Sequence, residues 1–293
     1  MTEAACTASP PSLDVRPQRT IGAVREVAGR GLHFGELVRM RIVPASPDSG
    51  IVFVRADMPE APEIPATLDS LAHDDLLRRT TLRWGAAEVH TVEHLLAAAY
   101  ALGVTNLRVE LTASELPFLD GSSLPLAELL CDAGLADQRA TIDVLRPQEP
   151  LAFRHEFAEI TVMPSTDFRV TFFFSSDEPL LRNQAASFVV TPETFVAQIA
   201  PARTFAFFNE IEALRRKGLI RGGSLASAVV IGRKAILNET LRFPDEPVRH
   251  KILDFIGDLA LLGKPVLGHF LVWRSGHRAN AAFAQYLRKE LAT

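Results

Sequence analysis

The stretch VRHKILDFIGDLALLG, residues 248–263, has the pattern of a helix with one polar stripe on an otherwise apolar surface. His250, Asp254 and Asp258 stand four residues apart in turn, so they share one face of the helix. The residues between them are mostly Ile, Leu and Phe, which is unusual for a solvated helix face. The stripe has two interpretations: a half-buried helix with a His–Asp pair, or two ligands of a metal such as zinc that accepts imidazole and carboxylate together.

A second motif, HTVEH at residues 90–94, matches the His-x-x-Glu-His pattern of inverted zinc proteases, in which both histidines bind zinc and the glutamate is the base. Together with the first stretch, the chain offers a base, Glu93, and four candidate ligands: His90, His94, His250 and Asp254. A catalytic zinc ion keeps three protein ligands and leaves the fourth position to water. One histidine is therefore surplus, and a metalloprotease that uses His90 is one alternative.

The tripeptide SGH at residues 275–277 places a histidine after a predicted strand, where a loop would expose its ring. A lone loop histidine is more often an ordinary surface residue. Hydrolysis of an amide, however, needs a base for the attacking water, stabilisation of the oxyanion and an acid for the leaving amine. Glu93, a metal and His277 match those roles. A binding module without turnover is a second alternative, against which the presence of both Glu93 and His277 argues.

Composition and charge exclude several classes of function. The 293 residues include 31 Lys and Arg and 35 Asp and Glu, so the net charge of −4 offers no strong basic field for nucleic acid or anionic lipid. The longest apolar runs fall short of the roughly 20 residues of a membrane-spanning helix, and the N-terminus lacks the pattern of a secretory signal. We expect a cytoplasmic protein without nucleic-acid partners or stable membrane insertion. Because Cys6 and Cys131 lie far apart, any metal must be held by histidine and carboxylate.

Strand-like and helix-like segments alternate in both halves of the chain. Residues 38–45 and 50–57 predict a hairpin, because turn formers separate two apolar runs; a helix at 89–104, a strand at 106–113 and a helix that ends near Gly134 follow. The second half predicts strands and helices in the same manner, in this order: strands 159–164 and 167–175, helices 191–203 and 244–263, strand 268–277, and a helix from about Asn280. Both halves have the segregated sheets and helices of an α+β fold.

The chain is long for one compact core and suits two domains of roughly 140 residues each. We expect a flexible leader rich in Ser, Pro, Thr and Ala at residues 1–18, an N-terminal α+β domain at 19–145 and a C-terminal α+β domain at 146–293.

Further motifs accompany those above, in this order: RTI, GLHFG, HTVEHLLAA, PFLDGSS, ARTFAFFNEIEALRRKGLIRGGS, ILNETLRFPDEPVRHKILDFIGDLALLG and SGH. From about Gln18 to the C-terminus, the set resembles one family in order and spacing. This family is that of the UDP-3-O-acyl-N-acetylglucosamine deacetylases, zinc amidases that commit a precursor to lipid A synthesis in Gram-negative bacteria. The ordered set is more specific than any single motif.

The resemblance implies which residues bind the metal. His94 of the TVEH motif, together with His250 and Asp254 of the RHK-x-x-D motif, would bind zinc, with Fe²⁺ as the alternative metal in the cell. Glu93 would be the general base, and His90 then has no role as a ligand.

It also implies how the reaction proceeds. Zinc and the base would activate a water that attacks the acetamide carbonyl, and His277, oriented by Asp258, would be the general acid. Thr204 would help to stabilise the oxyanion, Phe205 would line the sugar site and Lys251 would face the diphosphate. The UDP-linked acylated glucosamine substrate would yield acetate and a free amine. The family fold would be two domains of similar topology, each a small β-sheet packed on helices, with the helical layers facing each other, and we expect a monomer.

Three segments are less specific. Residues 171–179, TFFFSSDEP, lack the Phe-x-His-Pro stretch of many members, and Phe174 is the aromatic expected to stack on uracil. His33 stands where members have a histidine near the substrate phosphates, although a turn residue explains it equally well. The apolar stretch at 195–208 is a candidate for the acyl-chain passage, or it is an ordinary core helix.

Overall fold

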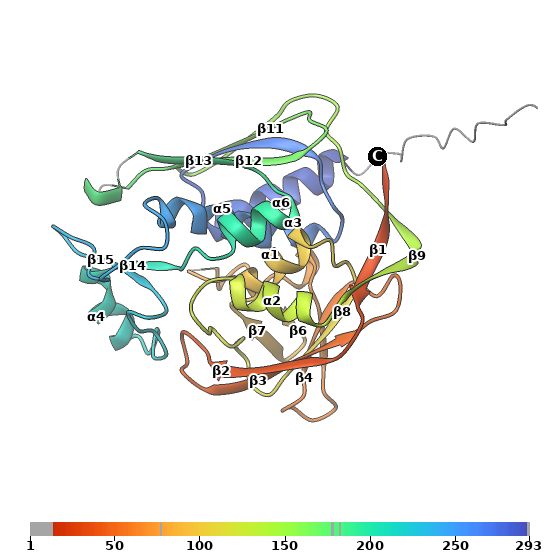
Figure 1. Ribbon diagram of the computed structural model, residues 1–293, viewed down its shortest axis with the longest axis horizontal. Helices are drawn as coiled ribbons and strands as arrows, with labels where there is room; N and C mark the ends of the chain where they lie inside the picture. Colours follow the sequence, from red (N-terminus) through yellow and green to blue (C-terminus); the bar gives the residue numbers. More distant parts are fainter. Residues whose placement is uncertain (1–13, 77, 177–178, 182, 292–293) are drawn as a thin grey trace, which may run out of the picture.

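The computed structural model describes residues 14–76, 78–176, 179–181 and 183–291. Two five-stranded sheets lie on opposite sides of the molecule, and the main helices pack between them (Figure 1). The predicted α+β class, with two halves of similar topology and facing helical layers, is confirmed.

The first sheet has the strand order β2-β3-β8-β4-β5. Its strands are β2 (Arg25–Arg30), β3 (Leu37–Pro44), β4 (Ile51–Arg55), β5 (Glu63–Pro65) and β8 (Leu107–Leu111). Strand β3 buries every second residue, Val38, Met40 and Ile42, and exposes those between. This alternation is typical of an antiparallel strand with one face on the core, and it turns the sheet's apolar face toward the helices.

The second sheet repeats this topology with the order β10-β11-β16-β12-β13. Its strands are β10 (Leu151–His155), β11 (Ala158–Met163), β12 (Phe168–Phe174), β13 (Gln184–Val189) and β16 (Gly268–Trp273). In each sheet the central strand, β8 or β16, runs parallel to one neighbour and antiparallel to the other. The two halves are thus built on one plan.

Each half also contributes two main helices. Helices α1 (Glu93–Ala101) and α2 (Leu124–Asp132) belong to the first half, and α5 (Glu246–Leu259) and α6 (His277–Leu291) to the second. Helix α1 packs on α5 at the centre of the molecule. Nearly every residue of α5 is buried, because this helix lies between its own sheet and α1.

Smaller elements complete the chain. Strands β1 (Val15–Ile21) and β9 (Leu135–Asp143) pair at one edge, and β6 (Thr81–Trp84) pairs with β7 (Ala87–His90). The second half inserts β14 (Phe205–Phe207), α4 (Phe208–Arg216) and β15 (Val229–Ile231), which project at the left of Figure 1. Short helical turns are η1 (Leu68–Ser70), η2 (Pro179–Leu181), α3 (Pro192–Thr194), η3 (Phe195–Ile199) and η4 (Ala260–Leu262).

The predicted hairpin of residues 38–45 and 50–57 is wrong. Strands β3 and β4 form there, but they do not pair with each other: β8 lies between them and bonds to both. A local turn signal cannot reveal a strand that enters from more than 50 residues later in the chain. The same insertion separates β11 from β12 in the second half.

The predicted helix at residues 89–104 begins later, at Glu93. Val89 and His90 end strand β7, and Thr91 has a positive φ of 60° that turns the chain from strand to helix. A threonine in this left-handed region is uncommon, and its hydroxyl donates to buried Glu115, which supports the conformation.

Most of the predicted leader, residues 1–13, lies outside the described residues. Residues 15–17 do not fit the prediction, because they pair with β9 in an antiparallel ladder. Strand β9 ends at Asp143 and β10 begins at Leu151, on either side of the boundary predicted at 145/146. The division into domains at this point remains a prediction.

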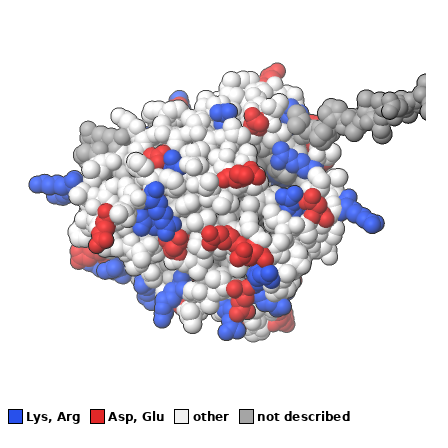
Figure 2. Space-filling model, in the orientation of Figure 1, with Lys and Arg blue, Asp and Glu red and all other residues white. Residues whose placement is uncertain are grey.

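Charged groups of both signs are interspersed over the face drawn in Figure 2. Among the described residues, no helix is long and apolar enough to cross a bilayer.

Candidate metal centre and catalytic cavity

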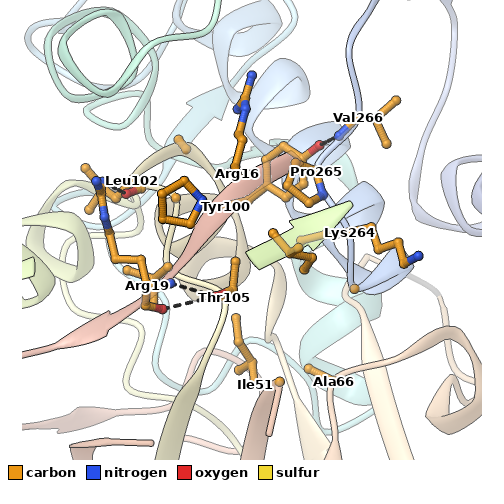
Figure 3. A pocket seen from close by; sticks show the side chains of 18 of the residues that line it. Arg16, Arg19, Ile51, Ala66, Tyr100, Leu102, Thr105, Lys264, Pro265 and Val266 are labelled. Carbon is orange, nitrogen blue, oxygen red and sulfur yellow. Dashed lines mark hydrogen bonds between the residues drawn. The ribbon is translucent and has the colours of Figure 1, made fainter. Parts of the chain in front are cut away.

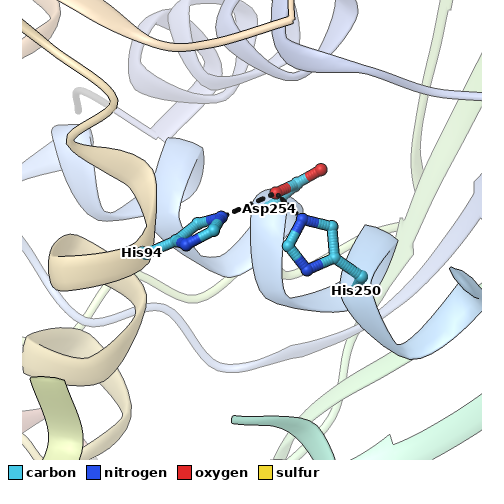
Figure 4. Close-up of side chains that lie close together, drawn as sticks. All are labelled: His94, His250 and Asp254. Atoms are coloured by element: carbon cyan, nitrogen blue, oxygen red, sulfur yellow. Dashed lines mark ion pairs between the residues drawn. The ribbon is translucent and has the colours of Figure 1, made fainter. Parts of the chain in front are cut away.

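Three side chains from the two central helices meet at one point. His94 is the second residue of α1, and His250 and Asp254 lie one turn apart on α5 (Figure 4). Nε2 of His250 is 3.3 Å, and Nε2 of His94 4.0 Å, from Oδ1 of Asp254. Three ligand atoms of these buried residues lie within 4.8 Å of one another. In the part of the chain that the structure describes, no other group of histidines, cysteines and carboxylates has this arrangement.

Close helix packing brings these residues together. A Cβ atom on Gly257 would lie 2.1 Å from the carbonyl oxygen of Glu93, so only glycine allows α5 to approach the start of α1 this closely. Ser123, just before α2, donates its hydroxyl to the carbonyl oxygen of His94 at 2.7 Å. The position of α1 is therefore fixed from both sides.

Hydrogen bonds also orient the atoms that could bind a metal. Nδ1 of His250 donates to the carbonyl oxygen of Ala202 at 3.0 Å, which leaves Nε2 as the nitrogen with a free lone pair toward the cluster. Nζ of Lys251 binds Oδ2 of Asp254 at 2.7 Å, while Oδ1 faces the histidines.

The electrostatics of the cluster suit a cation. Burial, followed by the neighbouring His250, lowers the pKa of His94 to about 3, and burial also lowers the pKa of His250. Burial alone would raise the pKa of Asp254, but Lys251 and the surrounding histidines lower it overall. At neutral pH the imidazoles are thus neutral and the carboxylate is ionised, which is the protonation state that binds a divalent metal. Two nitrogens and one carboxylate oxygen form a donor set that zinc accepts, so these residues fit a zinc ion.

Glu93 and His277 lie on either side of a space next to this cluster. Oε2 of Glu93 accepts from the backbone N–H of Thr80 at 3.0 Å, and Oε1 is 4.0 Å from Nε2 of His277. Burial is the main cause that raises the pKa of Glu93 to about 7. Burial alone would lower the pKa of His277, but the carboxylates of Asp258 and Asp254 raise it to about 9. The pair suits a base and an acid that act in the same reaction.

The expectation that His277 lies exposed on a loop is wrong. Only 8% of the residue is accessible, and it is the first residue of α6, three positions before the predicted start. The backbone N–H of Asn280 already donates to the carbonyl oxygen of Gly276 at 2.8 Å, and the hydroxyl of Ser275 donates to the Asn280 side chain. These bonds start the helix at the histidine and turn its ring inward.

A cavity of about 600 Å³ opens in front of the histidine–aspartate cluster, and its lining includes this cluster, Glu93 and His277. Thr204, expected to help stabilise the oxyanion, also lines this cavity, as do Phe205 and Lys251 of the predicted substrate site. Phe174 reaches it from the end of β12 and packs edge-on against Phe205, with ring centroids 5.5 Å apart.

His33 and His90 do not join the site. His33 does not line the cavity; its ring is buried, and its backbone N–H donates to Glu115. Nδ1 of His90 lies 3.1 Å from the Thr81 hydroxyl, and its ring packs against Phe34. The stretch expected to form either a passage or a core helix buries Phe195 and Ile199 completely, and only its end, from Thr204 on, lines the cavity.

Sequence reasoning did not identify two residues that bind Asp258. Thr80 donates its hydroxyl to Oδ1 of Asp258, and Asn280 donates its amide to Oδ2 at 2.8 Å. Thr80 lies 178 positions from Asp258, so no local pattern connects them. Asn280 follows His277 at helical spacing on α6 and could have been found from that spacing.

A second cavity, of about 360 Å³, lies at the opposite end of α1 (Figure 3). The hydroxyl of Tyr100 accepts from the backbone N–H of Val266 there. Of the three basic residues in its wall, Arg16, Arg19 and Lys264, the last two are paired with Asp137 and Asp143. The cavity that contains the histidine–aspartate cluster is therefore the candidate catalytic site.

Comparison with known proteins gives one consistent family. A sequence model of the family described as UDP-3-O-acyl N-acetylglycosamine deacetylase matches residues 18–289. Three relatives carry the name UDP-3-O-acyl-N-acetylglucosamine deacetylase. The protein of Thermodesulfovibrio yellowstonii is 36% identical over 94% of this chain and 92% of its own. That of Myxococcus xanthus is 40% identical over 90% and 83%, and that of an Anaeromyxobacter species 43% identical over 94% and 88%.

Proposed function

The chain belongs to the family of UDP-3-O-acyl-N-acetylglucosamine deacetylases, and from this membership we propose that it hydrolyses the acetamide of UDP-3-O-acyl-N-acetylglucosamine, with release of acetate and the free amine. We place this reaction at the committed step of lipid A biosynthesis in the cytoplasm of a Gram-negative bacterium. The observation that carries the proposal is the arrangement of a metal-ligand cluster, Glu93 and His277 around one cavity.

We assign the metal to His94, His250 and Asp254, whose neutral imidazoles and ionised carboxylate fit zinc. When bound, the ion would act as a Lewis acid that makes water more acidic and polarises the acetamide carbonyl. Fe²⁺ is the alternative in the cell, because a site of this kind does not select zinc by ligand type alone.

Glu93 accepts a proton from the attacking water as the new C–O bond forms at the acetamide carbon. Its raised pKa, about 7, makes it a stronger base than an ordinary carboxylate while it is still ionised in a large share of molecules near neutral pH. The side chain of Thr204, at the cavity wall, would face the oxyanion.

His277 donates a proton from Nε2 to the amine nitrogen as the C–N bond breaks. Its Nδ1 is held by Asp258 at 2.9 Å, so Nε2 is the nitrogen available to the substrate. Because the pKa is raised to about 9, the imidazolium that serves as acid predominates at neutral pH.

The remaining wall of the cavity would bind the substrate. We propose that Phe205 lines the sugar site, that the ammonium group of Lys251 contributes positive potential for the diphosphate, and that Phe174 stacks on uracil. All three line the cavity. His33 has no such support, because it is buried and does not line the cavity, and for this residue we favour the structural role.

The observations do not favour the protease alternative. That alternative needs His90 as a ligand, whereas His90 lies in β7 and contacts Thr81, outside the cluster. The test is acetate release by metal-replete protein from UDP-3-O-acyl-N-acetylglucosamine, with an acetylated peptide amide as the comparison. The proposal requires turnover of the sugar nucleotide. Cleavage of the peptide alone would support the protease, and turnover of neither would support a binding module.

A further inference from the structure

We propose that Thr80 is a positioning residue of the reaction, whose hydroxyl holds Asp258 so that His277 presents Nε2 to the leaving nitrogen. The inference rests on the proposed function. It adds a residue that lies in no motif of the site and that would not touch the substrate.

Thr80 lies where the catalytic groups of both halves meet. The residue is only 1% exposed and stands directly before β6. Its backbone N–H donates to Oε2 of Glu93 at 3.0 Å, and its hydroxyl binds Asp258. One residue thus contacts the base on α1 and the carboxylate on α5.

The hydroxyl has a single proton, and the geometry decides where it goes. Asp258 is an acceptor only, so Thr80 donates to its Oδ1. The hydroxyl oxygen also lies 3.2 Å from Nδ1 of His277, which itself donates to Oδ2 of Asp258 at 2.9 Å. The Thr80 hydroxyl therefore contacts both Asp258 and His277: it donates its proton to the carboxylate, and its oxygen faces the imidazole.

Both oxygens of the carboxylate are fixed as a result. Oδ2 accepts hydrogen bonds from His277 and Asn280. Among the described residues, Thr80 is the donor to Oδ1. Removal of the hydroxyl leaves a nearly fully buried carboxylate oxygen without a partner, which is costly. Rotation of the Asp258 carboxylate toward other hydrogen-bond donors then becomes favourable, and this rotation disturbs its bond to Nδ1 of His277.

The adjacent residue provides a matched control. Thr81 is also buried, but its hydroxyl donates to Asp75 and lies near His90, away from Asp258. Thr80→Val and Thr81→Val are the same nearly isosteric change at neighbouring positions, and both keep the backbone N–H groups. A loss confined to Thr80→Val would come from its hydroxyl and not from the general cost of a buried valine.

The experiment measures kcat and KM for acetate release, bound metal and thermal stability for wild type, Thr80→Val, Thr80→Ser, Thr80→Cys and Thr81→Val. We expect Thr80→Val to lower kcat by about 10- to 100-fold, by analogy with the loss of a hydrogen-bond partner that holds a metal ligand. KM should stay within about twofold, because the substrate is not touched. Metal content should not change, and Thr80→Ser should restore most of kcat. Thr80→Cys, whose S–H is only a weak donor, replaces Thr80→Val as the test of the hydroxyl if the valine variant does not fold.

A second readout does not depend on turnover. Nitrogen-15 NMR of histidine-labelled protein reports which ring nitrogen carries a proton, with His277→Gln to assign the signal. The His277 signal should be alike in wild type, Thr80→Ser and Thr81→Val, and should change in Thr80→Val.

The inference is overturned if wild type is active and Thr80→Val keeps kcat within about twofold of the wild-type value. It is also overturned if Thr81→Val lowers kcat as much as Thr80→Val does, or if the His277 signal is the same in Thr80→Val as in wild type. Inactive metal-replete wild type would instead overturn the proposed function, so the two failures are distinguishable.

Discussion

His277 donates from Nδ1 to Oδ2 of Asp258 at 2.9 Å, although the two residues come from different helices, α6 and α5. This bond fixes the orientation of the ring and leaves Nε2 as the nitrogen near Glu93 and Asp254, at 4.0 and 3.9 Å. The proposed acid, the proposed base and the candidate metal ligands thus share one small volume, and the predictions below follow from this arrangement.

Glu93→Gln should lower kcat by about 10²- to 10⁴-fold, the range that general acid–base groups contribute. Glutamine keeps the side-chain volume and can still accept from the N–H of Thr80, but it cannot take a proton from water. Bound metal, measured by elemental analysis, should remain at the wild-type level, because Glu93 is not in the ligand cluster. Wild-type activity in this variant would remove Glu93 from the role of base.

Asp254→Ala should abolish metal binding, whereas His90→Ala should leave it intact. Asp254 is central to the cluster, and His90 lies outside it. The measurement is the metal content of each purified variant after dialysis against zinc. The reverse result, metal lost with His90 and kept without Asp254, would favour the protease arrangement.

The dependence of kcat on pH should be bell-shaped. The rate rises as Glu93, with a pKa raised to about 7, loses its proton, and falls as His277, with a pKa raised to about 9, loses its own. A bound cation lowers both values, because positive charge favours the deprotonated carboxylate and the neutral imidazole. Asp258→Asn removes the carboxylate that most raises the pKa of His277, so the alkaline limb should move to lower pH. An alkaline limb that survives unchanged in His277→Ala would belong to another group.

Gly257→Ala should destabilise the protein by roughly 1–3 kcal/mol, the usual cost of overpacking, and should lower activity. The new methyl group would meet the carbonyl oxygen of Glu93 and push α5 away from α1. Thermal unfolding checks the first effect and acetate release the second. Gly22→Ala is the control, because a Cβ there meets its nearest atom at 3.4 Å. If both variants unfold alike, the close approach of the helices is not required.

Glu246→Gln should lower the free energy of unfolding by roughly 3 kcal/mol at pH 7, as expected when one partner of a buried ion pair is removed. Burial alone would raise the pKa of Glu246, but Arg203 and the backbone N–H groups of Arg203 and Arg242 lower it below 4.5. A lowered folded-state pKa stabilises the protein above the unfolded value and ceases to do so as pH falls through the folded value. The difference between variant and wild type, from urea unfolding, should therefore shrink below pH 4.5.

Glu212→Gln provides the control for that comparison. Glu212 pairs with Arg216 on α4, but its side chain is 78% exposed, so its loss should cost little at either pH. An equal loss of unfolding free energy in both variants would mean that the buried ion pair stabilises the protein no more than the exposed pair does.

The sequence alone was sufficient to predict the fold class and most element types, because periodicity is a local signal. The alternation in β3 and the helical spacing in α5 appear directly in the chain. Which strands pair was not predictable in this way: β8 enters between β3 and β4 from a distant part of the chain. The junction at Thr91 was missed for the same reason, since its positive φ is supported by Glu115 from beyond α1.

For the site, motifs pointed to the cluster residues and to Glu93 and His277, which the structure brings to one cavity. Burial of His277, the contacts of Thr80 and the placement of His33 depend on tertiary packing. No spacing rule connects Thr80 with Asp258, because packing of the two halves makes that contact.

The central claim is that this cavity performs metal-dependent deacetylation, and the most direct measurement is the rate of acetate release from UDP-3-O-acyl-N-acetylglucosamine before and after chelation. Metal-replete protein should release one acetate per amine formed, chelated protein should release none, and added zinc should restore the rate. Release that continues at the same rate after the metal has been removed, as verified by elemental analysis, would contradict the account.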